Sequence, residues 1–175
     1  MSKGLPELIY PYQLARSGRS LQGPIPVARM WRLAETLCST AGEIVIDLRF
    51  RRGEHGRFCI QGRIRGELQL VCQRCMEPLP WSANCEVRLG LIPATMSRER
   101  LECGYEPLVA PEDSPLSLAT MVEDELLLTL PIVPMHPANR CPMAGVVLGP
   151  GVDRDRDPQE SPFAALKNLK HRLTS

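Results

Sequence analysis

The chain of 175 residues has no apolar run that approaches the ~18 residues needed to cross a membrane, so we expect no membrane partner. Residues 1–12 lack the charged-then-apolar layout of a secretory signal, and we therefore expect a cytoplasmic protein. The seven cysteines are an odd number at irregular spacing. This pattern argues against a framework of disulfides and favours reduced thiols, some of which are candidates for binding metal.

The usual sequence signatures of catalysis are also missing. There is no phosphate-binding P-loop, no Gly-x-Gly-x-x-Gly motif, no His-Glu-x-x-His motif and no Ser/His/Asp setting. The three histidines, His55, His136 and His171, are scattered and leave little for general-base chemistry. We therefore expect a protein that is not an enzyme.

What the sequence does contain is typical of one globular domain with an uneven distribution of charge. Hydrophobic residues make up 43% and charged residues 23%, with a net charge of only +1. Residues 49–74 nevertheless carry seven arginines against two acids, whereas residues 99–125 carry eight acids against one base. This asymmetry predicts a basic face and an acidic face on the same domain.

Three long segments alternate apolar and polar residues, which indicates half-buried strands. The clearest runs from Ile44 to Arg51, and the others cover residues 57–71 and 79–92. Residues 52–56 are typical of a hairpin loop, so the three strands form an antiparallel meander. Within the second strand, Gly62 and Gly66 predict bulges or points of close approach.

The remaining elements are shorter. Residues 8–16 predict a first strand, limited to a sheet edge by Pro11, and residues 105–109 predict another short strand. An amphipathic helix is expected to begin near Pro26 and to end before Gly42, and a second helix to begin at Ser117 and to end at Pro131. The fold class is therefore α+β, a mostly antiparallel sheet with two flanking helices and a tethered C-terminal helix.

The domain boundaries follow from composition. Residues 1–144 form the α+β core domain, and residues 145–160, rich in Gly, Pro, Asp and Arg, predict a flexible linker. Residues 161–175 predict a short basic helix or tail that carries Phe163 and Leu166 on one face.

The Cys72-Gln73-Arg74-Cys75 stretch joins the second and third long strands. A Cys-x-x-Cys turn presents two zinc ligands together, and His136 and Cys141 are the candidates that complete a tetrahedral structural zinc site. The alternative is that the two cysteines merely fill a turn. A redox role is disfavoured, because a redox pair usually opens a helix, whereas this one joins two strands.

Arginines at alternate positions indicate a second candidate site. If Leu48, Phe50, Ile60 and Ile64 face the core, then Arg49, Arg51, Arg63 and Arg65 share the opposite face. Arg74 lies at the end of that face. Guanidinium groups suit phosphate oxygens, so these five arginines predict an RNA-binding surface. The alternative is a solvated face paired with Asp47 and Glu67. The face lacks aromatic residues, which argues against readout of single-stranded sequence.

The acidic run Glu123-Asp124-Glu125 follows the start of the second helix. Three consecutive carboxylates fan around a helix and do not converge, so they form no acid/base pair. They favour helix stability and solubility, or contact with a basic protein partner.

Several stretches resemble the YceD family of large ribosomal RNA subunit accumulation proteins. Residues 70–79 are similar to its central motif, residues 121–136 to its second motif, and residues 161–170 to its C-terminal tail. Cys141 follows His136 as in the family's proteobacterial branch. Relatives in other bacteria carry more cysteines in this segment, which here is reduced to His136 and Cys141.

The resemblance implies a non-enzymatic, cytoplasmic ribosome-biogenesis factor that acts in synthesis, processing or stability of 23S ribosomal RNA. We expect it to bind ribosomal RNA or a large-subunit precursor particle. The alternative is an adaptor that holds a ribosomal protein or a processing enzyme without touching RNA. Glu123, Asp124, Glu125, Phe163 and Leu166 are the candidate contacts of such an adaptor.

Overall fold

The computed structural model describes residues 4–53, 56–93 and 104–145. The chain divides into two units, Met1–Ala144 and Gly145–Ser175. Within the described residues, all helices and strands belong to the first unit. Apart from Gly145, the predicted linker and the predicted C-terminal helix lie outside the described residues, so both stay predictions.

One mixed sheet forms the frame of the first unit. Its strands are β2 (Ser20–Pro26), β4 (Glu43–Arg52), β5 (Phe58–Val71), β6 (Pro78–Ile92) and β7 (Glu106–Val109), in the order β2-β4-β5-β6-β7. The short β3 (Leu37–Ser39) pairs with the C-terminal end of β5. Neighbours on the main path are antiparallel except β6 and β7, which are parallel. The predicted α+β class and the antiparallel meander of three long strands are confirmed.

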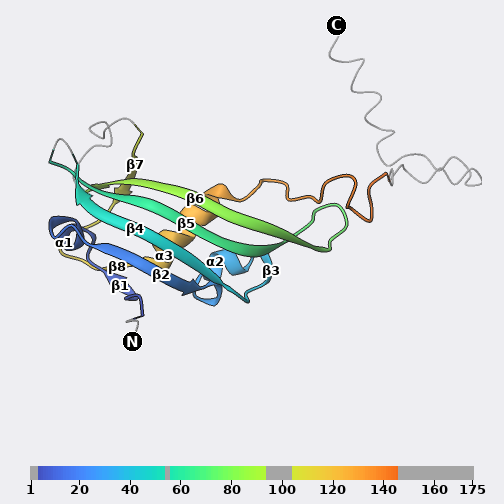
Figure 1. The fold of residues 1–175 in the computed structure, drawn as a ribbon, viewed down its shortest axis with the longest axis horizontal. Helices are drawn as coiled ribbons and strands as arrows, with labels where there is room; N and C mark the ends of the chain where they lie inside the picture. The colour runs from blue at the N-terminus through green and yellow to red at the C-terminus, as the bar shows by residue number, and fades with distance from the viewer. Residues whose placement is uncertain (1–3, 54–55, 94–103, 146–175) are drawn as a thin grey trace, which may run out of the picture. The chain divides into compact units, whose positions relative to one another are not determined.

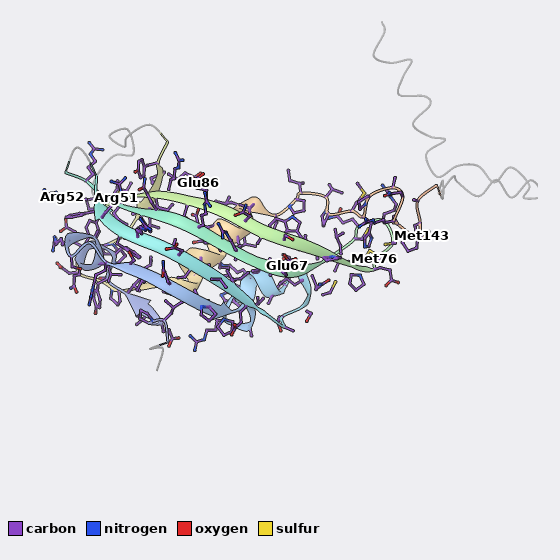
Figure 2. All side chains as sticks on the ribbon, in the orientation of Figure 1. Arg51, Arg52, Glu67, Met76, Glu86 and Met143 are labelled. Atoms are coloured by element: carbon purple, nitrogen blue, oxygen red, sulfur yellow. The ribbon has the colours of Figure 1, made fainter. Side chains whose placement is uncertain are left out.

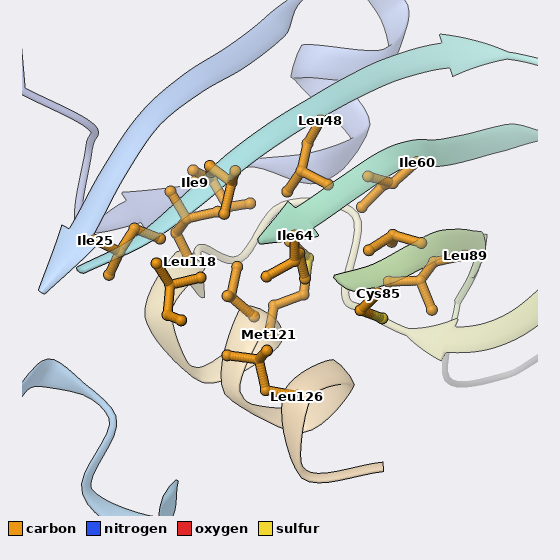
Figure 3. Packing of buried hydrophobic residues seen from close by; sticks show 14 of the residues in the cluster. Ile9, Ile25, Leu48, Ile60, Ile64, Cys85, Leu89, Leu118, Met121 and Leu126 are labelled. Carbon is orange, nitrogen blue, oxygen red and sulfur yellow. The ribbon is translucent and has the colours of Figure 1, made fainter. Parts of the chain in front are cut away.

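Alternation along the long strands separates a buried face from an exposed one. On β4 every second side chain is buried, and β5 and β6 repeat the pattern over most of their length. The helix α3 (Leu118–Thr129) covers the buried face, and Figure 3 shows Met121 and Leu126 of this helix packed toward Ile64 and Cys85. The opposite face carries the arginines and has no helix of the described residues over it (Figure 1).

The helix α3 begins where the sequence predicts. The Ser117 side chain accepts a hydrogen bond from the Thr120 amide at 3.3 Å, which caps the first turn. Its last residue is Thr129, two residues before Pro131. Directly before α3 in the chain, β8 (Leu116–Ser117) pairs with β1 (Leu8–Ile9) in a separate two-stranded sheet.

The N-terminal third differs from the prediction in three places. The strand predicted over residues 8–16 is wrong beyond Ile9, because α1 (Pro11–Arg16) begins at Pro11, whose fixed φ suits a first helical position. The strand β2 was not predicted, since Pro24 and Pro26 weaken the strand signal; both are tolerated because β2 lies at the sheet edge.

The helix predicted between Pro26 and Gly42 is also wrong in extent. It is replaced by a 3₁₀ turn, η1 (Val27–Arg29), the short helix α2 (Trp31–Ala34), and β3. The physical reason is tertiary: pairing of β3 with β5 competes with continuation of the helix. Trp31, which the helical pattern placed on the apolar face, is 66% exposed.

Gly62 marks a close approach of β4 and β5. Pairing is regular on both sides of this residue, so there is no bulge, and an added Cβ would lie 1.9 Å from the carbonyl oxygen of Asp47. At Gly66 the nearest atom to an added Cβ is the mobile end of a side chain, Cδ1 of Ile44, at 2.4 Å. The nearest backbone atom to a Cβ at Gly66 is the Glu43 carbonyl oxygen, at 3.1 Å, so backbone leaves much less room at Gly62 than at Gly66.

We expect Gly62→Ala to lower the free energy of unfolding by about 2–3 kcal/mol, because the clash must push two paired strands apart. Gly66→Ala, the matched change on the same strand, is expected to cost only about 1 kcal/mol, since the Ile44 side chain can rotate. Urea unfolding of both variants measures the difference. Equal losses would contradict this account of Gly62.

Candidate functional site

The first candidate site is built on the turn between β5 and β6. The Cys72 amide donates to the Glu77 carbonyl at 3.0 Å, and the Met76 amide donates to the Cys72 carbonyl at 2.8 Å. Met76 has a φ of 61°, a left-handed conformation that is uncommon for a residue other than glycine. These constraints hold the two thiols of the Cys-x-x-Cys motif on the same side of one tight turn.

The chain that leaves α3 returns to this turn. The Gln73 amide donates to the Pro134 carbonyl at 2.8 Å, and the His136 amide lies 3.4 Å from Sγ of Cys72. A further turn, in which the Cys141 amide donates to the Pro137 carbonyl at 3.1 Å, brings in the last cysteine. Backbone hydrogen bonds therefore fix the segment that carries His136 and Cys141.

The structure brings together the four residues that the sequence singles out as candidate metal ligands. The sulfur atoms of Cys72, Cys75 and Cys141 and a ring nitrogen of His136 all lie within 4.8 Å of one another. Cys72 and Cys141 are buried, and the other two are partly buried. Ligands of a tetrahedral zinc ion, with Zn–S bonds of about 2.3 Å, lie about 3.7 Å apart, so a small contraction of this cluster would suit a metal ion.

The orientation of His136 fits metal binding. Its Nδ1 faces Sγ of Cys75 at 3.4 Å, and its Nε2 lies 3.1 Å from the carbonyl oxygen of Pro78. A carbonyl only accepts, so Nε2 carries the proton and Nδ1 turns its lone pair toward the thiols. A metal-binding histidine typically makes this kind of outer hydrogen bond to a backbone carbonyl.

The two thiols of the turn differ in acidity. Burial opposes ionisation of Cys72, but hydrogen bonds from the backbone of Cys75, His136 and Arg74 outweigh it and lower the pKa of Cys72 to about 5. Burial raises the pKa of Cys75, and its neighbours Cys72 and Cys141 raise it further. At neutral pH Cys72 therefore offers a thiolate, the form that binds metal.

The second candidate site is a hollow of about 560 Å³ on the exposed face of the sheet, lined by residues of β4, β5 and β6. Four arginines and two acids border it: Arg49, Arg63, Arg65, Arg88, Asp47 and Glu86. The hollow contains three of the five arginines that the sequence predicts to bind RNA. We name it the arginine hollow.

Three of its arginines have no direct side-chain partner among the described residues. The guanidinium groups of Arg49, Arg63 and Arg65 make no hydrogen bond or ion pair there, and all three side chains are exposed. Asp47 accepts from Gln22 at 2.8 Å and, in the described part of the chain, forms no ion pair with an arginine. Nor does Glu67 form an ion pair in the described part of the chain. Among the described residues, then, neither Asp47 nor Glu67 forms an ion pair with these arginines.

The other two predicted arginines lie elsewhere. Arg51, which lies on β4 as Arg49 does, donates to Gln61 at 2.7 Å and to the Tyr105 hydroxyl at 3.3 Å. Arg74 lies in the turn beyond the other end of β5, where it contacts Sδ of Met135 at 3.6 Å. Figure 2 shows Arg51 at one end of the sheet and Met76, two residues from Arg74, at the other. Arg74 therefore belongs to the cysteine cluster and not to the arginine hollow.

Arg88 and its neighbour Glu86 border the hollow and were not predicted from the sequence. Arg88 of β6 lies opposite Gln61 of β5, and its guanidinium forms an ion pair with Glu86 at 2.7 Å. The signal was available, because alternation along β6 puts Glu86 and Arg88 on the same face as Arg63. The predicted arginine face covered only the segments that form β4 and β5, and left out β6.

The acidic run on α3 is divided between interior and surface. Glu123 is 1% exposed and takes three hydrogen bonds, two from the Arg32 guanidinium at 2.9 and 2.8 Å and one from the Leu33 amide at 3.0 Å. Asp124 is exposed and pairs with the same arginine at 2.7 Å. Burial removes Glu123 from any surface on which a partner could dock, and its carboxylate instead holds α2 against α3.

Several apolar side chains after the middle of α3 are exposed. Leu128 is 74% and Ile132 95% exposed, and Val133 and Met135 are exposed as well. The predicted partner contacts Phe163 and Leu166 lie outside the described residues. Among the helices that the structure describes, none is long and apolar enough to pass through a lipid bilayer.

The fold and the two sites define a small α+β protein with a cluster of metal-binding residue types and an arginine-lined sheet face. The family model of the large ribosomal RNA subunit accumulation protein YceD matches residues 60–170. The chain is also 29% identical over 169 residues to the protein of that name from Haemophilus influenzae, covering 96% of this chain and 97% of the relative. No solved structure matches. The chain belongs to the YceD family.

Proposed function

We propose that this protein promotes accumulation of the large-subunit ribosomal RNA by binding that RNA, or a precursor particle, through the arginine hollow. The family supports the broader role in large-subunit RNA accumulation. The observation that supports the RNA contact is the set of three exposed arginines around one hollow, Arg49, Arg63 and Arg65, whose side chains form no ion pair with any residue that the structure describes. Arginines left unpaired on a rigid sheet are ready to bind phosphate oxygens.

Contacts between these arginines and RNA phosphates would be sufficient to hold the RNA, without any catalytic step. Neutralising several phosphates releases counterions, which drives binding of any exposed RNA backbone. Among the described residues, no aromatic side chain lines the hollow, which disfavours binding by base stacking. The protein would therefore hold the backbone of structured RNA and act by protecting or positioning it, in the cytoplasm where ribosomes are assembled.

The test compares two double variants with the same change in charge. Arg63→Gln with Arg65→Gln removes two cations from the hollow, whereas Arg29→Gln with Arg140→Gln removes two exposed cations elsewhere. We expect the first variant to weaken binding to large-subunit RNA and to reduce the slope of log affinity against log salt by about 1.8, or about 1.4 for single-stranded RNA. The second should leave the slope close to that of the unmodified protein.

The same slope for both variants would contradict a role for the hollow.

A second candidate function, an adaptor for a ribosomal protein or a processing enzyme, is supported by the exposed apolar side chains of Leu128, Ile132 and Val133. If the purified protein does not bind RNA but retains a ribosomal protein after nuclease treatment, the adaptor is the function.

We further propose that Cys72, Cys75, His136 and Cys141 hold a structural zinc ion. Three thiols and an imidazole are ligands that zinc prefers, and all four positions are filled by side chains, which suits a closed structural site. The ion would tie the segment after α3 to the turn between β5 and β6. Such a bond stabilises the folded chain, because the unfolded chain does not hold the four ligands together.

Metal analysis of the purified protein is expected to give one zinc ion per chain, and His136→Ala is expected to abolish it. A chelator should lower the melting temperature by about 5–10 °C, the equivalent of about 3 kcal/mol of ligand-linked stability. Cys38→Ser alters a thiol outside the cluster and should change neither result. Protein that melts at the same temperature with and without chelator, and contains no metal, would contradict the proposal.

A further inference from the structure

Two carboxylates lie among the arginines of the hollow, which is unexpected for a surface that only attracts phosphate. Asp47 of β4 lies opposite Arg63 of β5, and Arg63 lies opposite Glu86 of β6. The three form one row across the sheet, with a cation between two anions. Both carboxylates are exposed, and both border the hollow.

Each carboxylate retains an oxygen that can accept a hydrogen bond. Oδ1 of Asp47 accepts from Gln22 at 2.8 Å, and within the described residues Oδ2 accepts from no group. Oε1 of Glu86 accepts two hydrogen bonds from Arg88, at 3.1 and 2.7 Å, and Oε2 has no partner in the same part of the chain. The neighbouring Arg88 and Arg63 lower the pKa of Glu86, so this carboxyl remains an ionised acceptor at neutral pH.

Groups that bind phosphate lie on both sides of this row. The row toward one end of the strands contains Arg49, Gln61 and Arg88, and the row on the other side contains Val45, Arg65 and Asn84. Adjacent rows are two residues apart along each strand, about 6.6–6.8 Å. A sugar–phosphate backbone that runs across the strands, along one arginine row, would place its phosphates on the guanidinium groups and direct ribose 2′-hydroxyls toward the carboxylate row beside it.

We infer that Asp47 and Glu86 accept hydrogen bonds from ribose 2′-hydroxyl groups, so that the hollow binds RNA in preference to DNA. The inference rests on the proposed function, since it requires a nucleic-acid backbone in the hollow. Without a 2′-hydroxyl donor, a carboxylate beside a phosphate only repels it. The 2′-hydroxyl is the group by which a protein distinguishes RNA from DNA at a given site.

One short duplex prepared in three chemical forms provides the test: RNA, 2′-O-methyl RNA and DNA of the same sequence. The methylated duplex lacks the hydroxyl donor but retains a ribose-type substituent and an RNA-like shape, so it separates hydrogen bonding from shape. We expect the full chain to bind the RNA about tenfold more tightly than either other duplex, as measured by fluorescence anisotropy at one salt concentration.

Asp47→Ala with Glu86→Ala should abolish this preference, mainly because affinity for DNA and methylated RNA rises as repulsion is removed. The control pair Glu43→Ala with Glu67→Ala removes the same charge from exposed positions on these strands. Neither residue borders the hollow. The control should raise all three affinities together and leave their ratios unchanged.

The possible failures are distinguishable. Equal binding of RNA and 2′-O-methyl RNA, or an unchanged preference in the Asp47/Glu86 variant, would overturn this inference alone and leave the arginine hollow as a general phosphate site. Absence of binding to all three duplexes would overturn the proposed RNA contact and this inference with it.

Discussion

The unbroken antiparallel pairing of β4, β5 and β6 is the constraint on which both sites depend. Because side chains alternate between the faces of a strand, this register buries Ile46, Ile64 and Val87 and exposes Asp47, Arg63 and Glu86 on the other face. A slip of one residue would turn the arginines into the core. Gly62 supports the register where β4 approaches most closely, and its backbone is part of the lining of the arginine hollow.

The same strand connects the two sites. One part of β5 carries Arg63 and Arg65, and its end leads into the turn that holds Cys72 and Cys75. The cysteine cluster fixes the chain that leaves α3, and α3 covers the buried face of the sheet (Figure 3). A metal ion in the cluster would therefore support the frame that presents the arginines, and would not need to contact RNA.

The long strands and the ligand cluster could be predicted from the sequence, because their signals are local. Alternation alone is sufficient for β4, β5 and β6, and a Cys-x-x-Cys turn with one histidine and one further cysteine is a recognisable set of zinc ligands. Glu123 could not be predicted as a buried residue. Its partners Arg32 and Leu33 lie about 90 residues earlier, and an acidic run resembles a solvated surface unless the tertiary fold is known. The helical pattern after Pro26 was similarly overridden by pairing of β3 with β5.

Photo-crosslinking of the intact protein to large-subunit precursor RNA, followed by mapping of the crosslinked peptides, tests the central claim most directly. If the arginine hollow holds the RNA, crosslinks should concentrate in the peptides of β4 and β5 that contain Arg49, Arg63 and Arg65, and salt should reduce their yield. Crosslinks confined to the segment after α3, or found only between this chain and another protein, would contradict the account.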